Sequence, residues 1–99
     1  MILKMYSIRD SKAEIYNRIW CLTTHGEAER AFRDLANDDG TTVGKHPEDY
    51  DLYYLGKFDD NSGKFEPVDS PEHIVKAVNL VKQLKLDQNV VGAQEVLPL

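Results

Sequence analysis

The stretch KHPEDYDLYYLGKFDDNSGKF, residues 45–65, contains the pattern of a β-hairpin. Residues 51–58 are rich in aromatic and aliphatic side chains and predict a strand, and residues 64–68 predict a shorter partner. Between them, Asp59-Asp60-Asn61-Ser62-Gly63 has the composition of a turn, because Asp and Asn side chains bond to their own backbone and glycine accepts positive φ. The stretch therefore predicts two antiparallel strands of a sheet.

A helix is predicted upstream of this hairpin. Thr24-His25-Gly26-Glu27 has the spacing of a capping box, in which the Thr24 hydroxyl accepts from the Glu27 amide and the Glu27 carboxylate reaches back to Thr24. The apolar positions that follow have the spacing of one helical stripe: Ala28, Ala31, Phe32 and Leu35. Asn37-Asp38-Asp39-Gly40 is typical of a helix end.

The remaining segments complete a β-β-α-β-β-α order. Residues 2–9 and 18–23 predict strands, and the polar residues 10–17 between them predict a loop. Ser70 as a cap and Pro71 at the first helical position predict a second helix, whose buried stripe would be Ile74, Ala77, Val78, Val81 and Leu84. We therefore expect an α+β fold, a small antiparallel sheet with two amphipathic helices packed on one face.

The composition is that of one soluble globular domain. Of the 99 residues, 41% are hydrophobic and 29% are charged, which separates the chain from disordered proteins. We expect residues 1–86 to form a single domain and residues 87–99 a C-terminal tail or arm. No apolar run approaches the roughly 18 to 20 residues that span a bilayer, so we expect no membrane association. Cys21 is alone, which excludes an internal disulfide.

The net charge of −5 is unevenly distributed. Residues 27–70 carry twelve acidic side chains against five basic ones, whereas residues 1–18 carry four basic side chains against two acidic ones. An acidic chain repels a polyanion over most of its surface, so a nucleic-acid face would have to use the basic ends of the fold.

The sequence gives no indication of a metal, a cofactor or catalysis. Counted from Asp59, the glycine of the acidic turn falls at position 5 and Ser70 at position 12, which fails the register of a calcium-binding EF-hand loop. His25, His46 and His73 are scattered, and no pair of cysteines is present to build a zinc site. Phosphate-binding and nucleophile motifs are absent, so we expect a protein that is not an enzyme.

The aromatic and basic side chains suggest a surface for single-stranded nucleic acid. Tyr53 and Tyr54 are adjacent on a strand and must face opposite sides of the sheet, so one belongs to the core and the other is free to be exposed. An exposed sheet face with aromatic rings and cations would stack bases and contact phosphates. The alternative is that the rings only fill a small core. The candidate residues are Tyr6, Arg9, Lys12, Arg18, Trp20, Tyr53, Tyr54 and Lys57.

Part of the chain resembles a known viral family. The matching features are Tyr6-Ser7-Ile8-Arg9-Asp10, Thr24-His25-Gly26-Glu27-Ala28, the block KHPEDY at 45–50 and the turn GKFDD at 56–60. Over roughly residues 4–66 the chain is similar to the small nonstructural protein of microviruses, the gokushovirus type of single-stranded DNA phage. The resemblance brings no catalytic motif.

The resemblance implies a nonstructural phage protein that acts in the host cytoplasm during replication of the phage genome. It implies DNA binding, with single strands favoured, and control of the switch to single-strand synthesis or packaging. In this hypothesis Arg9, Lys12 and Arg18 contact phosphates, and Tyr6, Trp20 or one of the pair Tyr53 and Tyr54 stacks on bases.

A second hypothesis places no DNA on the protein. The acidic middle of the chain would bind the replication initiator or a host replication protein and would mimic or compete with DNA. A third, an assembly scaffold that forms homo-oligomers, would require an exposed apolar helix surface. The first two differ in their response to salt, since direct phosphate contact weakens steeply as salt rises.

Overall fold

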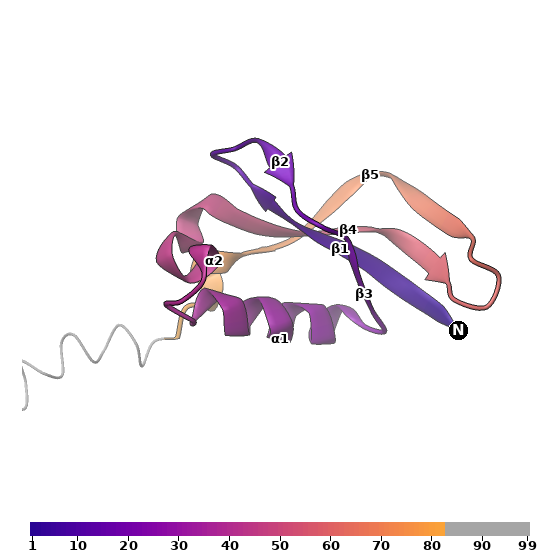
Figure 1. Ribbon diagram of the computed structural model, residues 1–99, viewed down its shortest axis with the longest axis horizontal. Coiled ribbons are helices and arrows are strands. Elements are labelled where there is room, and N and C mark those ends of the chain that lie inside the picture. Colours follow the sequence, from indigo (N-terminus) through magenta and orange to yellow (C-terminus); the bar gives the residue numbers. More distant parts are fainter. Residues whose placement is uncertain (83–99) are drawn as a thin grey trace, which may run out of the picture.

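The computed structural model describes residues 1–82, which form a twisted sheet with helical segments beneath it (Figure 1). The strands of this part of the chain are β1 (Ile2–Asp10), β2 (Ile15–Tyr16), β3 (Trp20–Leu22), β4 (Tyr50–Asp59) and β5 (Phe65–Lys76). Its helices are α1 (His25–Ala36), the short α2 (Thr42–Lys45), and the 3-10 turns η1 (Pro47–Asp49) and η2 (Ala77–Leu80). The predicted α+β class with a small antiparallel sheet is confirmed. None of the described helices is long and apolar enough to span a membrane.

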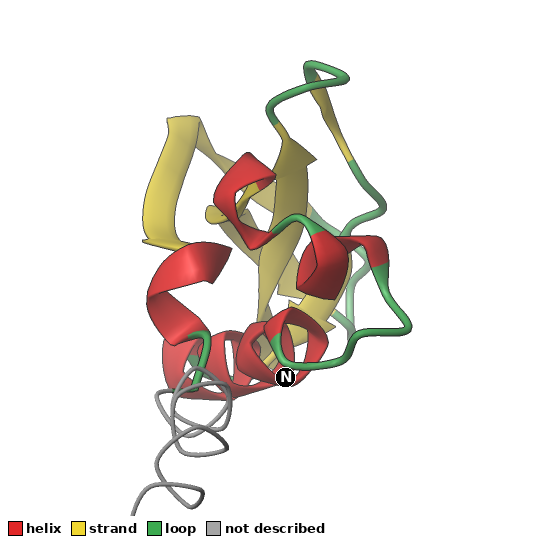
Figure 2. Ribbon diagram, turned by 90° about the vertical axis from the view of Figure 1, so that its left-hand side faces the viewer, coloured by secondary structure: helices red, strands yellow, loops and turns green. Residues whose placement is uncertain are grey.

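The long N-terminal strand β1 organises the sheet. All described pairings are antiparallel, and the strand order is β2-β1-β4-β5, with β3 pairing the other half of the β1 edge that β2 occupies. Tyr6 on β1 pairs with Trp20 on β3 and with Tyr54 on β4. This register places three large rings on one face of the sheet, where α1 lies (Figure 2).

Helix α1 begins and ends where the sequence predicts. The Thr24 side chain accepts a hydrogen bond from the Glu27 amide at 3.1 Å. The Glu27 carboxylate accepts from the hydroxyl and amide of Thr23. The Thr23 hydroxyl is the main cause that lowers the pKa of Glu27, and the Thr24 amide that the capping box predicts also contributes to lowering it. Asn37 caps the other end.

The core lies between α1 and one face of the sheet. Ala28, Phe32 and Ala36 of α1 are fully buried and form its inward stripe. From the sheet they meet Tyr6, Ile8, Leu52 and Tyr54, and from the neighbouring turns Val43, Ala77 and Leu80. Burying this apolar surface is the main favourable term in folding a domain of this size.

The predicted second helix is wrong for the residues that the structure describes. Strand β5 continues through Ser70 and Pro71 to Lys76, and only the short turn η2 follows. Pairing with β4 makes this segment a strand and not a helix: Val75 lies opposite Leu52, and His73 lies opposite Tyr53. Two register shifts in the β4–β5 pair let the edge strand accommodate its prolines. Leu84 and the predicted tail at 87–99 lie outside the described residues.

Three smaller elements were not predicted. The predicted loop at 10–17 contains β2, and the segment before β4 contains α2 and η1. Helix α2 packs tightly against the residues that follow α1. A Cβ added to Gly44 would lie 2.0 Å from the Asp38 carbonyl oxygen, which is closer than any real contact. Glycine is therefore required at this contact.

Candidate nucleic-acid interface

The face of the sheet opposite α1 is not covered by any helix of the described part of the chain (Figures 1 and 2). Strand alternation sends Leu52 and Tyr54 toward α1 and sends Asp51 and Tyr53 to the other side. We call this second side the open face and define it by Arg9, Tyr16, Asp51, Tyr53, His73 and Lys76.

A row of three rings crosses the open face. The centroids of Tyr16 on β2 and Tyr53 on β4 are 5.4 Å apart, and those of Tyr53 and His73 on β5 are 5.3 Å apart. Both contacts are edge-on, at 84° and 80°. Tyr16 and Tyr53 meet across β1 because Ser7, opposite Tyr53 on that strand, is small and fully buried. The Ser7 hydroxyl donates to the Asn17 carbonyl oxygen at 2.7 Å, so this buried hydroxyl has a partner.

Charged side chains accompany the rings. The Arg9 guanidinium carbon lies 5.8 Å from the centroid of the Tyr16 ring, within the range of a cation–π contact. The side chain of Asp51 is only 14% exposed. Its Oδ2 lies 2.5 Å from Nε2 of His73, and its Oδ1 lies 3.2 Å from Nζ of Lys76. Among the residues that define the open face, two cations, Arg9 and Lys76, stand against one carboxylate, Asp51.

The sequence-predicted aromatic residues divide between the two faces. Tyr53 belongs to the open face, whereas Tyr6 is fully buried and Tyr54 is 8% exposed. Trp20 is half-buried and packs against the same core. The Tyr6 hydroxyl lies 2.5 Å from Nδ1 of His25, and burial raises the pKa of Tyr6 to about 12, with smaller contributions from Tyr54 and Glu27. The buried rings stabilise the fold and are not accessible to a base.

The sequence-predicted basic residues lie at separate places. Arg9 is on the open face, and Lys12 is exposed in the turn between β1 and β2. Arg18 is exposed between β2 and β3. Lys57 is exposed on β4. In the strand register it lies opposite Lys4 of β1 and Glu66 of β5, beyond the register shift at Gly56. The structure brings Arg9 and Tyr53 to one surface and does not gather the others there.

Four residues of the open face were not among the sequence candidates, and of these only Asp51 lies in a segment predicted as a strand. Tyr16 lies in a segment predicted as a loop, and His73 and Lys76 lie in a segment predicted as a helix. The pairs of His73 with Tyr53 and of Lys76 with Asp51 are long-range, and no local pattern indicates them, whereas Tyr16 pairs with Arg9 in a local hairpin. The alternation of polar and apolar residues around Tyr53 is the signal that could have indicated such a face.

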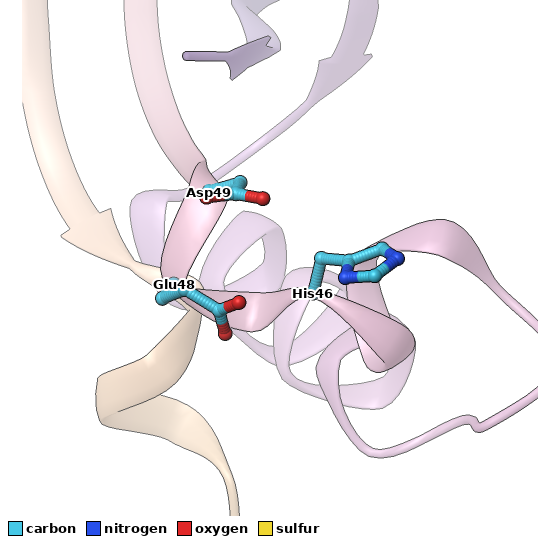
Figure 3. A group of neighbouring side chains, drawn as sticks. All are labelled: His46, Glu48 and Asp49. Carbon is cyan, nitrogen blue, oxygen red and sulfur yellow. The ribbon is translucent and has the colours of Figure 1, made fainter. Parts of the chain in front are cut away.

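One cluster could hold a divalent cation. His46, Glu48 and Asp49, all at η1, offer one donor atom each within 4.8 Å of one another (Figure 3). His46 and Glu48 are exposed, and three donors are one fewer than a structural zinc site uses. The cluster lies within four consecutive residues and carries no further observation of a ligand, so we assign no metal to it.

Comparison with known proteins gives the family. The model of a family described as Phage ORF5 protein matches residues 3–80. Protein ORF5 of Chlamydia phage 1 is 40% identical over 70 residues, which cover 66% of this chain and 72% of that protein. No solved structure matches the chain. The resemblance to a small protein of gokushovirus-type microviruses is confirmed, and the match extends past residue 66 through β5 to η2. The chain therefore belongs to the phage ORF5 family.

Proposed function

We propose that the protein binds single-stranded DNA through the open face, as a nonstructural factor in replication of a single-stranded DNA phage genome. One observation carries the proposal: a row of three rings flanked by Arg9 and Lys76 lies on a sheet face that no described helix covers. The binding role requires no catalytic step and no cofactor.

The rings supply the contact with bases. Tyr16 is 38% exposed and Tyr53 is half-buried, so each offers ring surface on a rigid strand. Stacking of a base on an aromatic side chain contributes about 1–3 kcal/mol and tolerates any base. Bases of a duplex already stack on one another and are not available, which favours single strands.

The cations supply the contact with phosphates. Arg9 is placed at the Tyr16 end of the row and Lys76 near the His73 end, so a strand that follows the rings would meet a positive charge at both ends. Lys12, in the turn that follows β1, can extend this path. Asp51 partly neutralises Lys76, which limits the affinity.

The acidic remainder of the protein orients the complex. The exposed acids Asp34 and Asp38 belong to α1 and the residues that follow it, on the side of the sheet opposite the open face. Like charge repels DNA there, so the strand would be directed to the open face. In replication, coverage of newly made single strands in this way would favour single-strand synthesis or packaging over duplex replication.

The test is fluorescence anisotropy of the full chain with labelled single- and double-stranded oligonucleotides, at low and moderate salt. We expect salt-dependent binding that is tighter for single strands. Tyr53→Ala should weaken it about tenfold, whereas Phe65→Ala, at a 69% exposed ring outside the row, should not. Arg9→Glu should weaken it more than Arg30→Glu on α1, which makes the same charge change.

Two results would contradict the proposal. Absence of binding even at low salt would exclude direct contact by the isolated protein. Equal losses for Tyr53→Ala and Phe65→Ala would move the contact away from the row of rings. Circular dichroism and thermal melting of each variant separate loss of binding from loss of fold.

The alternative function is an acidic regulator that binds the replication initiator or a host replication protein without touching DNA. The observation in its favour is the excess of acidic residues in 27–70, of which Asp34, Asp38 and Glu48 are exposed. In that case, a triple change of these acids to their amides would abolish partner binding, and Arg9→Glu would have no effect.

A further inference from the structure

An apolar groove lies between α1 and the strands β1 and β3. Its volume is about 480 Å³, and it is lined by Ile8, Trp20, Ala31, Asp34, Leu35 and Asp38. Trp20 and Leu35 also line an adjoining hollow that continues to Arg18. The size is in the range of pockets that accept small molecules or a few side chains.

The floor of the groove is apolar. Ala31 and Leu35 are four residues apart on α1, beside the fully buried stripe of that helix. Trp20 and Leu35 pack against the core and keep part of their surface accessible. An aromatic ring next to aliphatic side chains can bind an apolar side chain by burial and a guanidinium by stacking.

The rim of the groove is acidic. Asp34 and Asp38 are both exposed, four residues apart around the C-terminal end of α1. The Asp38 carboxylate accepts from the Gly40 amide at 2.8 Å, and no ion pair joins either carboxylate to another residue within 1–82. An occupant that brings a positive charge to this rim is therefore favoured over an anion.

The apolar floor and the acidic rim together select a class of partner. We propose that the groove binds a short basic and apolar peptide segment of a partner protein. An aliphatic side chain of the segment lies over Trp20 and Leu35, and an arginine meets Asp34 and Asp38. Arginine suits the site better than lysine, because its planar guanidinium stacks on an indole and binds a carboxylate with two hydrogen bonds. This surface is separate from the open face, and the inference does not depend on DNA binding.

Trp20 is the single tryptophan of the chain and reports on the groove directly. The test is a titration of the full chain with a capped tetrapeptide of alternating leucine and arginine, followed by tryptophan fluorescence. We expect saturable binding and a shift of the emission to shorter wavelength, because a leucine covers the ring. Two control peptides, with glutamate in place of arginine or serine in place of leucine, should bind about tenfold more weakly.

Substitutions in the charged rim test the electrostatic part of the contact. Asp34→Asn with Asp38→Asn should weaken peptide binding about three- to tenfold, because two ion pairs with the peptide are lost. The matched control is Glu48→Gln with Glu72→Gln, the same charge change at exposed acids outside the groove, which should leave the affinity within about twofold.

Substitutions in the floor test the apolar part. Ala31→Gln would place a long polar side chain in the groove and should weaken binding several-fold, whereas Ala31→Ser leaves the groove open and should not. Tyr53→Ala, on the open face, should leave peptide binding unchanged, so that failure of this inference and failure of DNA binding are distinguished.

Two results would overturn the proposal. Absence of saturable binding by the full chain would show that the groove does not accept such a peptide. Equal losses for the Asp34 and Asp38 variant and for its control would place the contact on the acidic surface in general and not in the groove. Circular dichroism of each variant separates loss of binding from loss of fold.

Discussion

Tyr53 and Tyr54 are neighbours on β4, and they show how differently the two faces of this sheet use the same side chain. Tyr54 is 8% exposed, and its ring packs 5.7 Å from Tyr6 and 5.0 Å from His25 beneath α1. Tyr53 faces the other way and joins the row with Tyr16 and His73. On the covered face a ring contributes volume to the core. On the open face it contributes surface and directional contacts, which is what recognition requires.

The largest expected effect separates these two roles. Tyr54→Ala should lower the free energy of unfolding by about 3–5 kcal/mol, because it leaves a cavity in the core. Tyr53→Ala should lower it by about 1 kcal/mol or less and should weaken DNA binding instead. Urea denaturation of both variants measures the difference. Equal losses of stability would show that the open face is as much a part of the core as the covered one.

The next largest effect is expected at Gly56, where the register between β4 and β5 shifts. Gly56 has φ of +141°, and a Cβ there would lie 2.4 Å from the Glu66 carbonyl oxygen on β5. Gly56→Ala should therefore cost about 2–3 kcal/mol, since it adds backbone strain and a clash with a neighbouring strand.

Gly63→Ala is the control for this position. Gly63 also has positive φ, +77°, but its Cβ would meet no atom within 4 Å, so only the conformational cost of about 1 kcal/mol remains. Similar melting temperatures for the two variants would contradict the clash at β5.

A smaller effect depends on pH and on the covered face alone. The pKa of Tyr6 is about 12 in the folded protein against 10 for an ordinary tyrosine. Below pH 10 the phenol is neutral in both states, and between pH 10 and 12 the unfolded chain loses this proton first. Stability should therefore fall across this window, by about 1–2 kcal/mol.

The check is urea denaturation at about pH 9 and about pH 11. Tyr6→Phe should be less stable at the lower pH, since the bond to His25 is lost, by about 1 kcal/mol. It should also lose less stability than the wild type between the two pH values. An identical pH dependence in both proteins would show that Tyr6 does not cause it.

The smallest expected effect concerns the charge of the open face. Asp51→Asn removes the carboxylate that binds Lys76 and His73 and leaves a neutral side chain of the same shape. Under the proposed function, affinity for single-stranded DNA should rise two- to fivefold at low salt, with a smaller gain at moderate salt. Asp34→Asn on α1 makes the same change away from the face and should have no such effect. A weaker complex for Asp51→Asn would mean that the ion pairs position Lys76 for binding.

Local signals in the sequence predicted the elements that local interactions determine. The cap at Thr24, the apolar stripe and Asn37 place α1, and the Asp- and Gly-rich turn places the hairpin of β4 and β5. The residues after Ser70 fail for the converse reason. A proline after a serine and an apolar stripe favour a helix, but pairing of Val75 with Leu52 and His73 with Tyr53 outweighs that preference.

The candidate site was predictable in part for the same reason. Alternation requires that Tyr53 and Tyr54 separate, but which of them meets α1 depends on the pairing of Tyr54 with Tyr6. His73 and Lys76 join the open face through partners far away in the sequence, and Tyr16 meets Tyr53 only because β1 pairs with β4. Their place on the sheet follows from the whole topology and from no motif.

The central position of β1 has a consequence for how the chain folds. Its partners on β4 are distant in sequence, from Asp10 with Tyr50 to Ile2 with Asp59, so this pairing closes loops of about 40 to 57 residues. Such long closures are entropically costly and slow, and they are typical of domains that fold in milliseconds to seconds. During synthesis, β1 would leave the ribosome well before β4 exists. Until β4 is made, the edge of β1 that pairs with it has no partner and is open to wrong pairing.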